Sequence, residues 1–234
     1  MSFLMLSRAE PEARALLQRA LRARYGVRPV PVESVRLNLL GGARGPLGLP
    51  ARVEMVVSYV GTTHWRCETR HKLFGLTIRQ CVESLDGGAY FLSKNQRVTA
   101  YSDPLVLASF RRRLWAGHAL FLTPLTVEHV TLKMAGERSI QAVPDTNPDD
   151  VATLTFNPDD TLAQVEVQRY RIDDQRTLPF FLRPENGLQT LNEFIVPVRL
   201  ACQWADSPAD VFRVTGADLN PRIPLTEFSM QPTA

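Results

Sequence analysis

Hydrophobic and polar residues alternate along most of the chain after Pro124, and this period of two constrains the fold more than any other feature of the sequence. Successive side chains of a β-strand point to opposite faces of its sheet, so alternation is typical of strands with one buried face. The alternating segments are short, and Gly, Pro, Asn or Asp separates most of them, as expected at turns. The pattern predicts an antiparallel meander. Its strands are TVEHVTLKM, RSIQAV, VATLTF, LAQVEVQRYRI, EFIVPVRLACQW and DVFRVTG.

The tetrapeptide NPDD occurs twice in this meander, at 147–150 and 157–160. A calcium-binding loop counted from Asp145 would need Gly at its sixth position and Glu at its twelfth, where this chain has Asp150 and Phe156. Asn and Pro are favoured where a chain turns. We interpret the two copies as turns that bracket a strand, with a weak surface cation site as the alternative.

The first hundred residues also predict strands. Residues 33–40 and 51–60 are two of them, and the Gly-rich stretch 41–50 between them predicts a loop. A phosphate-binding loop must lead into a helix, whereas this one leads into an alternating strand. Residues 65–85 indicate one or two further strands, and a tight turn at 86–88 precedes the strand AYFLSK.

The N-terminal region predicts a basic amphipathic helix. Ser7 and Glu10 have the spacing of a capping box, Ala and Leu recur at helical spacing up to Tyr25, and Gly26 is expected to end the helix. Such a helix could lie on a membrane, but its narrow apolar stripe favours docking on the domain.

A second helix is predicted over residues 103–122. Asp103 followed by Pro104 is typical of a helix start, and Pro124 is expected to stop the helix. This is the most hydrophobic helix of the chain, and the Arg111–Arg113 run is assigned to its solvent-facing side. We predict ligand contacts from residues of this helix, namely Phe110, Leu114, Trp115, His118 and Phe121.

Composition excludes several classes of function. The net charge is only +3 and the basic residues form no dense patch, so we expect no binding of nucleic acid. No apolar run is long enough for a transmembrane segment or a signal peptide, and three separated cysteines indicate a reducing compartment. These features predict a cytoplasmic protein.

Candidate chemistry is sparse. His64, Cys67 and His71 have spacing suited to zinc, but alternate positions of one strand diverge and a structural zinc site needs four ligands. His118 could act as an acid or base, although no partner carboxylate is identifiable. No nucleophile motif is found, and the adjacent Asp pairs would diverge on strands. We predict no cofactor, no metal and no catalytic residue.

Three stretches carry a resemblance to a known family: ATLTFNPDDTLAQVEVQRYR, FIVPVRLACQW and FRVTGADLNP. They are similar to an uncharacterised bacterial family that resembles the curved half-barrel of bacterial lipoprotein carriers and related binders of apolar ligands. The resemblance covers about the last 110 residues. It implies an architecture and transfers no binding residue. Carriers of this type are exported, whereas no export signal is recognised here.

Together these observations predict an α+β protein. A strongly curved antiparallel sheet packs on a central apolar helix, with residues 1–30 as a helical appendage and 31–234 as one domain. The function favoured is non-enzymatic binding of a small apolar or acyl-chain ligand. A protein-interaction domain, which includes a homo-oligomer, and a small-molecule enzyme that uses His118 or His71 are the alternatives.

Overall fold

The computed structural model describes residues 9–44 and 49–231. Within them lie the helices α1 (Pro11–Tyr25) and α2 (Pro104–Phe121), the short 3₁₀-helices η2 (Thr123–Thr126) and η3 (Leu225–Glu227), and 13 strands in one sheet. The strands are β1 (Ser34–Arg44), β2 (Pro50–Val60), β3 (His64–Leu73), β4 (Leu76–Asp86), β5 (Ala89–Lys94), β6 (Arg97–Tyr101), β7 (Val130–Gly136), β8 (Ser139–Pro144), β9 (Ala152–Phe156), β10 (Leu162–Arg171), β11 (Arg176–Leu191), β12 (Phe194–Trp204) and β13 (Asp210–Leu219).

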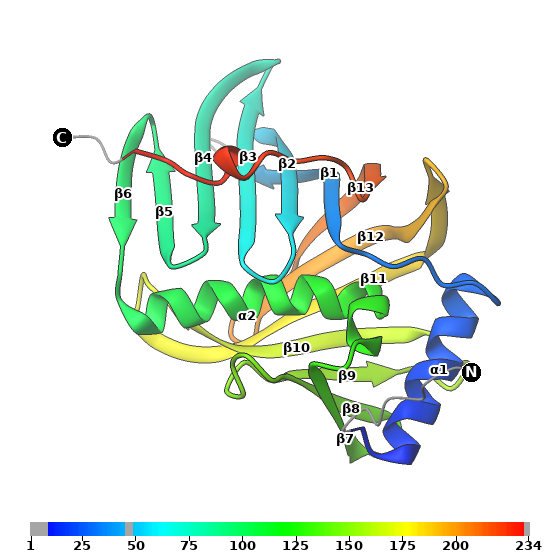
Figure 1. Cartoon of the computed structure of the whole chain (residues 1–234). Helices are drawn as coiled ribbons and strands as arrows, with labels where there is room; N and C mark the ends of the chain where they lie inside the picture. The colour runs from blue at the N-terminus through cyan, green and yellow to red at the C-terminus, as the bar shows by residue number, and fades with distance from the viewer. Residues whose placement is uncertain (1–8, 45–48, 232–234) are drawn as a thin grey trace.

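Two meanders meet in the middle of the sheet. The strand order is β6-β5-β4-β3-β2-β1-β13-β12-β11-β10-β9-β8-β7, and every pairing is antiparallel. The chain therefore runs outward from β1 to the edge strand β6, crosses to the other edge at β7, and returns inward to β13. Helix α2 makes this crossing along the hollow of the curved, unclosed sheet (Figure 1). The predicted α+β class with a curved antiparallel sheet is confirmed.

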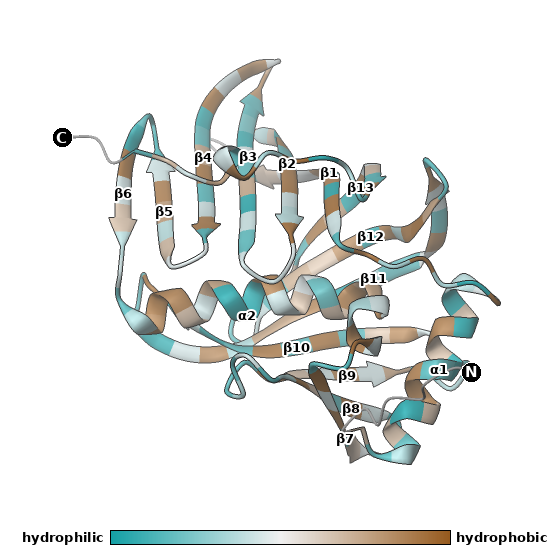
Figure 2. Ribbon diagram, viewed as in Figure 1, coloured by the Kyte–Doolittle hydropathy of each residue, from teal (hydrophilic) through white to brown (hydrophobic). Residues whose placement is uncertain are grey.

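Helix α2 begins and ends where the sequence predicts. The carboxylate of Asp103 accepts hydrogen bonds from the backbone N–H groups of Leu105 and Val106, and Pro104 follows it in the first turn. The helix ends at Phe121, and the next residue adopts a positive φ of 65°. Figure 2 shows a hydrophilic segment in the middle of this otherwise apolar helix.

That hydrophilic segment, Arg111–Arg113, is not the solvent face that the sequence predicts. Arg111 and Arg112 donate to the two carboxylate oxygens of Asp150 at 2.9 and 3.0 Å, and the Asp150 side chain is only 3% exposed. Arg113 pairs with Glu83 at 3.3 Å. The prediction fails because the sheet curves around the helix and brings carboxylates to the arginines.

The turn interpretation of the two NPDD copies is confirmed. The N–H of Asp150 donates to the carbonyl of Asn147 at 2.9 Å, and the N–H of Asp160 donates to that of Asn157 at 3.0 Å. Strand β9 lies between these turns. In the first copy the last Asp is also the buried partner of the α2 arginines, a role that the turn pattern does not predict.

Two strands were not predicted, and one loop was placed too early. Strand β11 contains Pro179 and Pro184, which weaken a strand pattern, and β6 is only five residues long.

The predicted loop over 41–50 is wrong at its start, because Gly41 and Gly42 belong to β1 and pair with β2. A Cβ on Gly41 would lie 2.7 Å from the ring of Phe212, so the glycine lets β13 approach closely. Residues 45–48 lie outside the described residues.

Helix α1 packs against the same hydrophobic core as α2 through Ala13, Leu16, Leu17, Ala20 and Leu21. Glu10 precedes the helix, and its carboxylate accepts from the N–H of Met134 on the edge strand β7. Gly26 ends the helix with φ 69°, as predicted.

The capping role expected of Ser7 lies outside the described residues, and the division into an appendage and a domain stays a prediction. No helix in residues 9–44 or 49–231 combines the length and the apolar character needed to cross a bilayer.

Candidate ligand-binding site

A cleft of about 540 Å³ opens beside the first half of α2. Strands β4 to β6 form one wall, and the strands from β10 to β13 form the other. Its volume lies within the range of about 300–1,000 Å³ that is usual for small-molecule sites. Aromatic side chains supply much of its surface: Tyr90, Phe110, Phe180, Trp204 and Phe212.

The cleft adjoins a smaller apolar void of about 60 Å³, and Met55, Arg113 and Cys202 line both spaces. One face of α2 borders the two in turn, with Phe110 and Arg113 at the cleft and Gly117 in the void. Apart from Arg113, the void is lined by apolar side chains, Tyr59 and the bare Cα of Gly117. Its other lining residues are Leu37, Leu39, Val57, Trp65, Leu120, Phe121, Leu182 and Leu200.

The five predicted contact residues are all buried, but the structure separates them. Phe110 lies in the cleft and Phe121 lines the void. Leu114, Trp115 and His118 lie on another face of α2, beside a space of about 20 Å³ that has room for about one water molecule. Ligand contact at these five residues stays a prediction.

His118 is held as a neutral packing residue. Its Nε2 lies 2.7 Å from the carbonyl oxygen of Gly61, so this nitrogen carries the proton and donates it. The ring packs on Tyr59 with centroids 4.6 Å apart, and burial lowers the pKa of His118 to about 4. We therefore propose no acid–base role for it.

Of the cleft residues named above, only Phe110 was predicted, and a further unpredicted residue of the cleft, Arg169, is charged. It lies on β10 and is 4% exposed. Its Nε donates to the carbonyl oxygen of Ser109 on α2 at 3.0 Å. Burial, followed by the nearby charge of Arg113, lowers the pKa of Arg169 to about 9. Its guanidinium carbon lies 4.7–5.3 Å from the centroids of three aromatic rings, those of Phe110, Phe180 and Trp204.

A signal for Arg169 was present in the sequence. Alternation places it on the same face of its strand as Val165 and Val167, both of which are buried in the core. An inward-facing arginine breaks the usual pattern, and such breaks are expected at functional sites.

The nearest acid in the cleft is already engaged. Glu83 pairs with Arg113 through one carboxylate oxygen and accepts the hydroxyl of Tyr90 at 3.1 Å through the other. The ring of Tyr90 stacks on Phe110 with centroids 3.6 Å apart. Burial and the neighbouring Glu83 raise the pKa of Tyr90, so its hydroxyl stays protonated.

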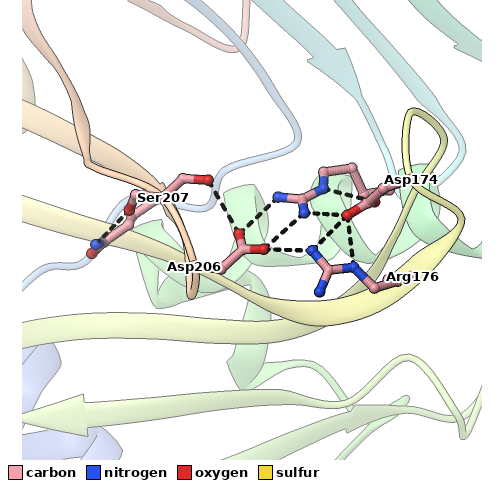
Figure 3. A network of polar contacts seen from close by, with 6 residues as sticks. Asp174, Arg176, Asp206 and Ser207 are labelled. Atoms are coloured by element: carbon pink, nitrogen blue, oxygen red, sulfur yellow. Dashed lines mark hydrogen bonds and ion pairs between the residues drawn. The ribbon is translucent and has the colours of Figure 1, made fainter.

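An ion-pair network stands at the rim of the cleft. Figure 3 shows Arg176 between Asp174 and Asp206, and Arg171 pairs with the same two carboxylates. Hydrogen bonds from Arg171 lower the pKa of both Asp174 and Asp206, the latter to about 2. The positive charge of Arg171 is thereby neutralised at the rim.

Neither metal binding nor thiol chemistry is indicated in this part of the molecule. Within residues 9–44 and 49–231 no three His, Cys, Asp or Glu side chains cluster as metal ligands would. His64 pairs with Asp86 at 3.1 Å, while Cys67 points into the core. Burial raises the pKa of Cys67 to about 12 and that of Cys202 to about 11, so both thiols are protonated at neutral pH.

The curved sheet wrapped around one helix, with a cleft between them, defines the class of fold. No protein-family model matches the sequence, and no curated protein matches it. The chain is similar in structure to a LolA superfamily protein from Nitrosomonas europaea, with 13% identity, a TM-score of 0.51 and coverage of 93% of this chain and 97% of that one. It is also similar to a DUF1329 family protein from Desulfovibrio piger, with 8% identity, a TM-score of 0.51 and coverage of 94% and 98%.

These comparisons confirm the predicted resemblance to the half-barrel of lipoprotein carriers and extend it from the C-terminal half to nearly the whole chain. They also overturn one prediction. The cytoplasmic location expected from the sequence is contradicted by the similarity in fold to a LolA superfamily protein. The cysteine argument failed because three free thiols show only that these side chains do not pair, whatever the compartment.

Proposed function

We propose that this protein binds a small apolar or acyl-chain ligand between α2 and the sheet, as a periplasmic binding or carrier protein and not as an enzyme. The observation that carries the proposal is that the aromatic cleft and the apolar void adjoin along one face of α2 and share Met55, Arg113 and Cys202 in their walls. A flexible chain that entered the cleft could extend into the void. The apolar surface that it buried would contribute a favourable free energy of about 25 cal/mol per Å². The LolA-like fold supports the proposal.

The direct test is to identify what the protein carries. Purified protein is extracted with organic solvent and the extract is analysed by mass spectrometry, and delipidated protein is titrated with a fluorescent fatty acid. Trp204 lies in the cleft, so a brominated acyl chain should quench tryptophan emission on binding. If no amphiphile copurifies and the titration shows no saturable binding, the proposal is refuted.

A steric variant locates the site. Cys202 lies where the cleft meets the void, so Cys202→Phe should block the junction and weaken acyl-chain binding about tenfold or more. Gln203→Phe is the matched control, because alternate residues of β12 point to opposite faces and Gln203 bonds with Arg183 outside the cleft. Equal losses in the two variants would argue against binding at this place.

The protein-interaction alternative stays a prediction with one observation in its favour. Phe74 and Leu76, at the turn between β3 and β4, are 86% and 73% exposed. Exposed apolar side chains of this size are typical of contact surfaces. Sedimentation at two concentrations, with Phe74→Ser as the comparison, would reveal an oligomer that depends on this turn.

A further inference from the structure

The guanidinium of Arg169 is buried without a counterion. Among the described residues, its sole hydrogen bond runs from Nε to the Ser109 carbonyl, and no carboxylate lies within 4.0 Å of it. Glu83, the acid nearest in the cleft, is taken by Arg113 and Tyr90. Both terminal nitrogens of Arg169 thus remain without an acceptor in residues 9–44 and 49–231.

A buried charge without a partner is costly, and proteins normally avoid it. Three aromatic rings surround this guanidinium and hold it in place. The face of a ring is, however, a weaker hydrogen-bond acceptor for an N–H group than an anionic oxygen is. The position is therefore poised to gain from an anion that enters the cleft.

The other charges of the cleft leave this anion site in place. Its basic residues are Lys94, Arg113, Arg169 and Arg171, and its acids are Glu83, Asp173 and Asp210. Asp173 and Asp210 are exposed to solvent, where their fields are screened. Arg113 and Arg171 are each paired with a carboxylate. Lys94 is exposed to solvent, so among the described residues Arg169 is the buried cation of the cleft that is left to a ligand.

We infer that the ligand is an anionic amphiphile, a single acyl chain whose carboxylate or phosphate head group accepts hydrogen bonds from both terminal nitrogens of Arg169. This inference rests on the proposed function and names the class of its ligand. The planar fork of a guanidinium matches two oxygens of a carboxylate or a phosphate. With the head at Arg169, the chain lies against Phe110 and extends past Arg113 and Cys202 into the void.

The test compares ligands that differ only in their head group. Delipidated wild-type protein is titrated with palmitate, with a lysophosphatidate of the same chain and with hexadecanol, which is uncharged. Hexadecanol cannot form the pair of charge-assisted hydrogen bonds with Arg169. It should therefore bind about ten- to a hundredfold more weakly than the preferred anion. The two anions then distinguish a carboxylate ligand from a phosphate ligand.

Arg169→Met should bring palmitate and lysophosphatidate down to the affinity of hexadecanol while hexadecanol itself is little affected. Arg138→Met, which removes the same charge in the turn between β7 and β8, where Arg138 pairs with Asp160, is the control and should leave all three unchanged. Should Arg169→Met not fold, Arg169→Lys keeps the charge but removes the planar fork, and it should bind the two anions more weakly than wild type while hexadecanol is unchanged. The titrations of wild-type protein decide by themselves whether the ligand is anionic.

The outcomes separate the two proposals. Equal binding of all three ligands by wild-type protein would overturn the inference about Arg169 and leave acyl-chain binding intact. Binding of none of the three would overturn both. Selective binding of an anion that Arg138→Met also loses would overturn the assignment to Arg169.

Discussion

Arg24, at the end of α1, donates hydrogen bonds to the carbonyl oxygen of Leu120 in the last turn of α2 and, at 2.9 Å, to that of Ile195 in β12. The hydroxyl of Tyr25 donates to the carbonyl of Phe121 at 2.9 Å. The last carbonyls of a helix have no partner within the helix, and a cation there interacts favourably with the helix dipole. Helix α1 therefore caps α2 and joins it to the sheet.

Replacing Arg24 should loosen this junction. We expect Arg24→Met to lower the free energy of unfolding by about 1–3 kcal/mol, because the carbonyls it serves lose their donor in a buried position. Urea denaturation measures the change. Arg22→Met, two residues earlier and exposed, should change stability by less than about 0.5 kcal/mol. Equal effects of the two variants would show that the cap contributes little.

The two aspartates of the first NPDD turn should respond differently. Asp150→Asn removes the charge that serves both Arg111 and Arg112, and we expect a loss of about 1–3 kcal/mol of stability. Asp149→Asn alters an exposed neighbour and should be nearly neutral. The midpoints of thermal unfolding distinguish them. A nearly neutral Asp150→Asn would mean that the turn, and not the ion pairs, sets the position of this segment.

Two glycines should have opposite responses to alanine. Gly117 lies inside α2, where a Cβ would meet only the Tyr59 ring at 4.0 Å, so Gly117→Ala should stabilise the protein by about 0.5–1 kcal/mol. Gly41→Ala should destabilise it by about 1–3 kcal/mol, because the new Cβ would overlap the Phe212 ring. Both are measured by urea unfolding. Changes of the same sign would contradict the packing described here.

His118 should make the stability depend on pH. Its folded pKa of about 4 lies below the unfolded value of 6.5, so the unfolded state takes up the proton first. The stabilising contribution of His118 to the free energy of unfolding is fully present above about pH 7. It amounts to about 3 kcal/mol and is lost as the pH falls from about 6.5 to about 4.

The measurement is the free energy of unfolding between pH 4 and pH 7 in wild type and in His118→Gln, whose amide can still donate to Gly61. The variant should show a weaker dependence on pH. His129→Gln replaces an exposed histidine and should keep the wild-type slope. Burial and Arg79 also lower the pKa of His71, which contributes equally to all three proteins and cancels in the comparison. Parallel curves for wild type and His118→Gln would refute the assignment.

Local sequence signals were sufficient for most elements. Helix α2 was predicted to within a residue at each end because Asp103 and Pro104 specify its start and Pro124 limits its end. Strand β10 was recognised from its alternation. Strand β11 was not, because Pro179 and Pro184 interrupt the pattern and a bulge with positive φ at Asn186 and Gly187 breaks its register. Such a strand is identified only by the partners it bonds to.

The candidate site was predicted less completely than the fold. Phe110 was named because it lies on the apolar stripe of α2, and it does line the cleft. Arg169 was passed over because a charged residue at an inward position conflicts with the rule that charges face water. Its surroundings come from α2, β11 and β12, and no pattern within β10 records them.

By itself, the sequence determined most of the strands (though not β6 and β11), where α2 begins and ends, and that one curved sheet would need an apolar helix in its hollow. These follow from alternation, turn residues and capping, which act between near neighbours. Only the tertiary structure decided that β1 pairs with β13, that Asp150 reaches Arg111 and Arg112, and that Arg169 faces a cleft without a counterion. Those contacts join residues far apart in the chain, and they depend on how the whole sheet bends around α2.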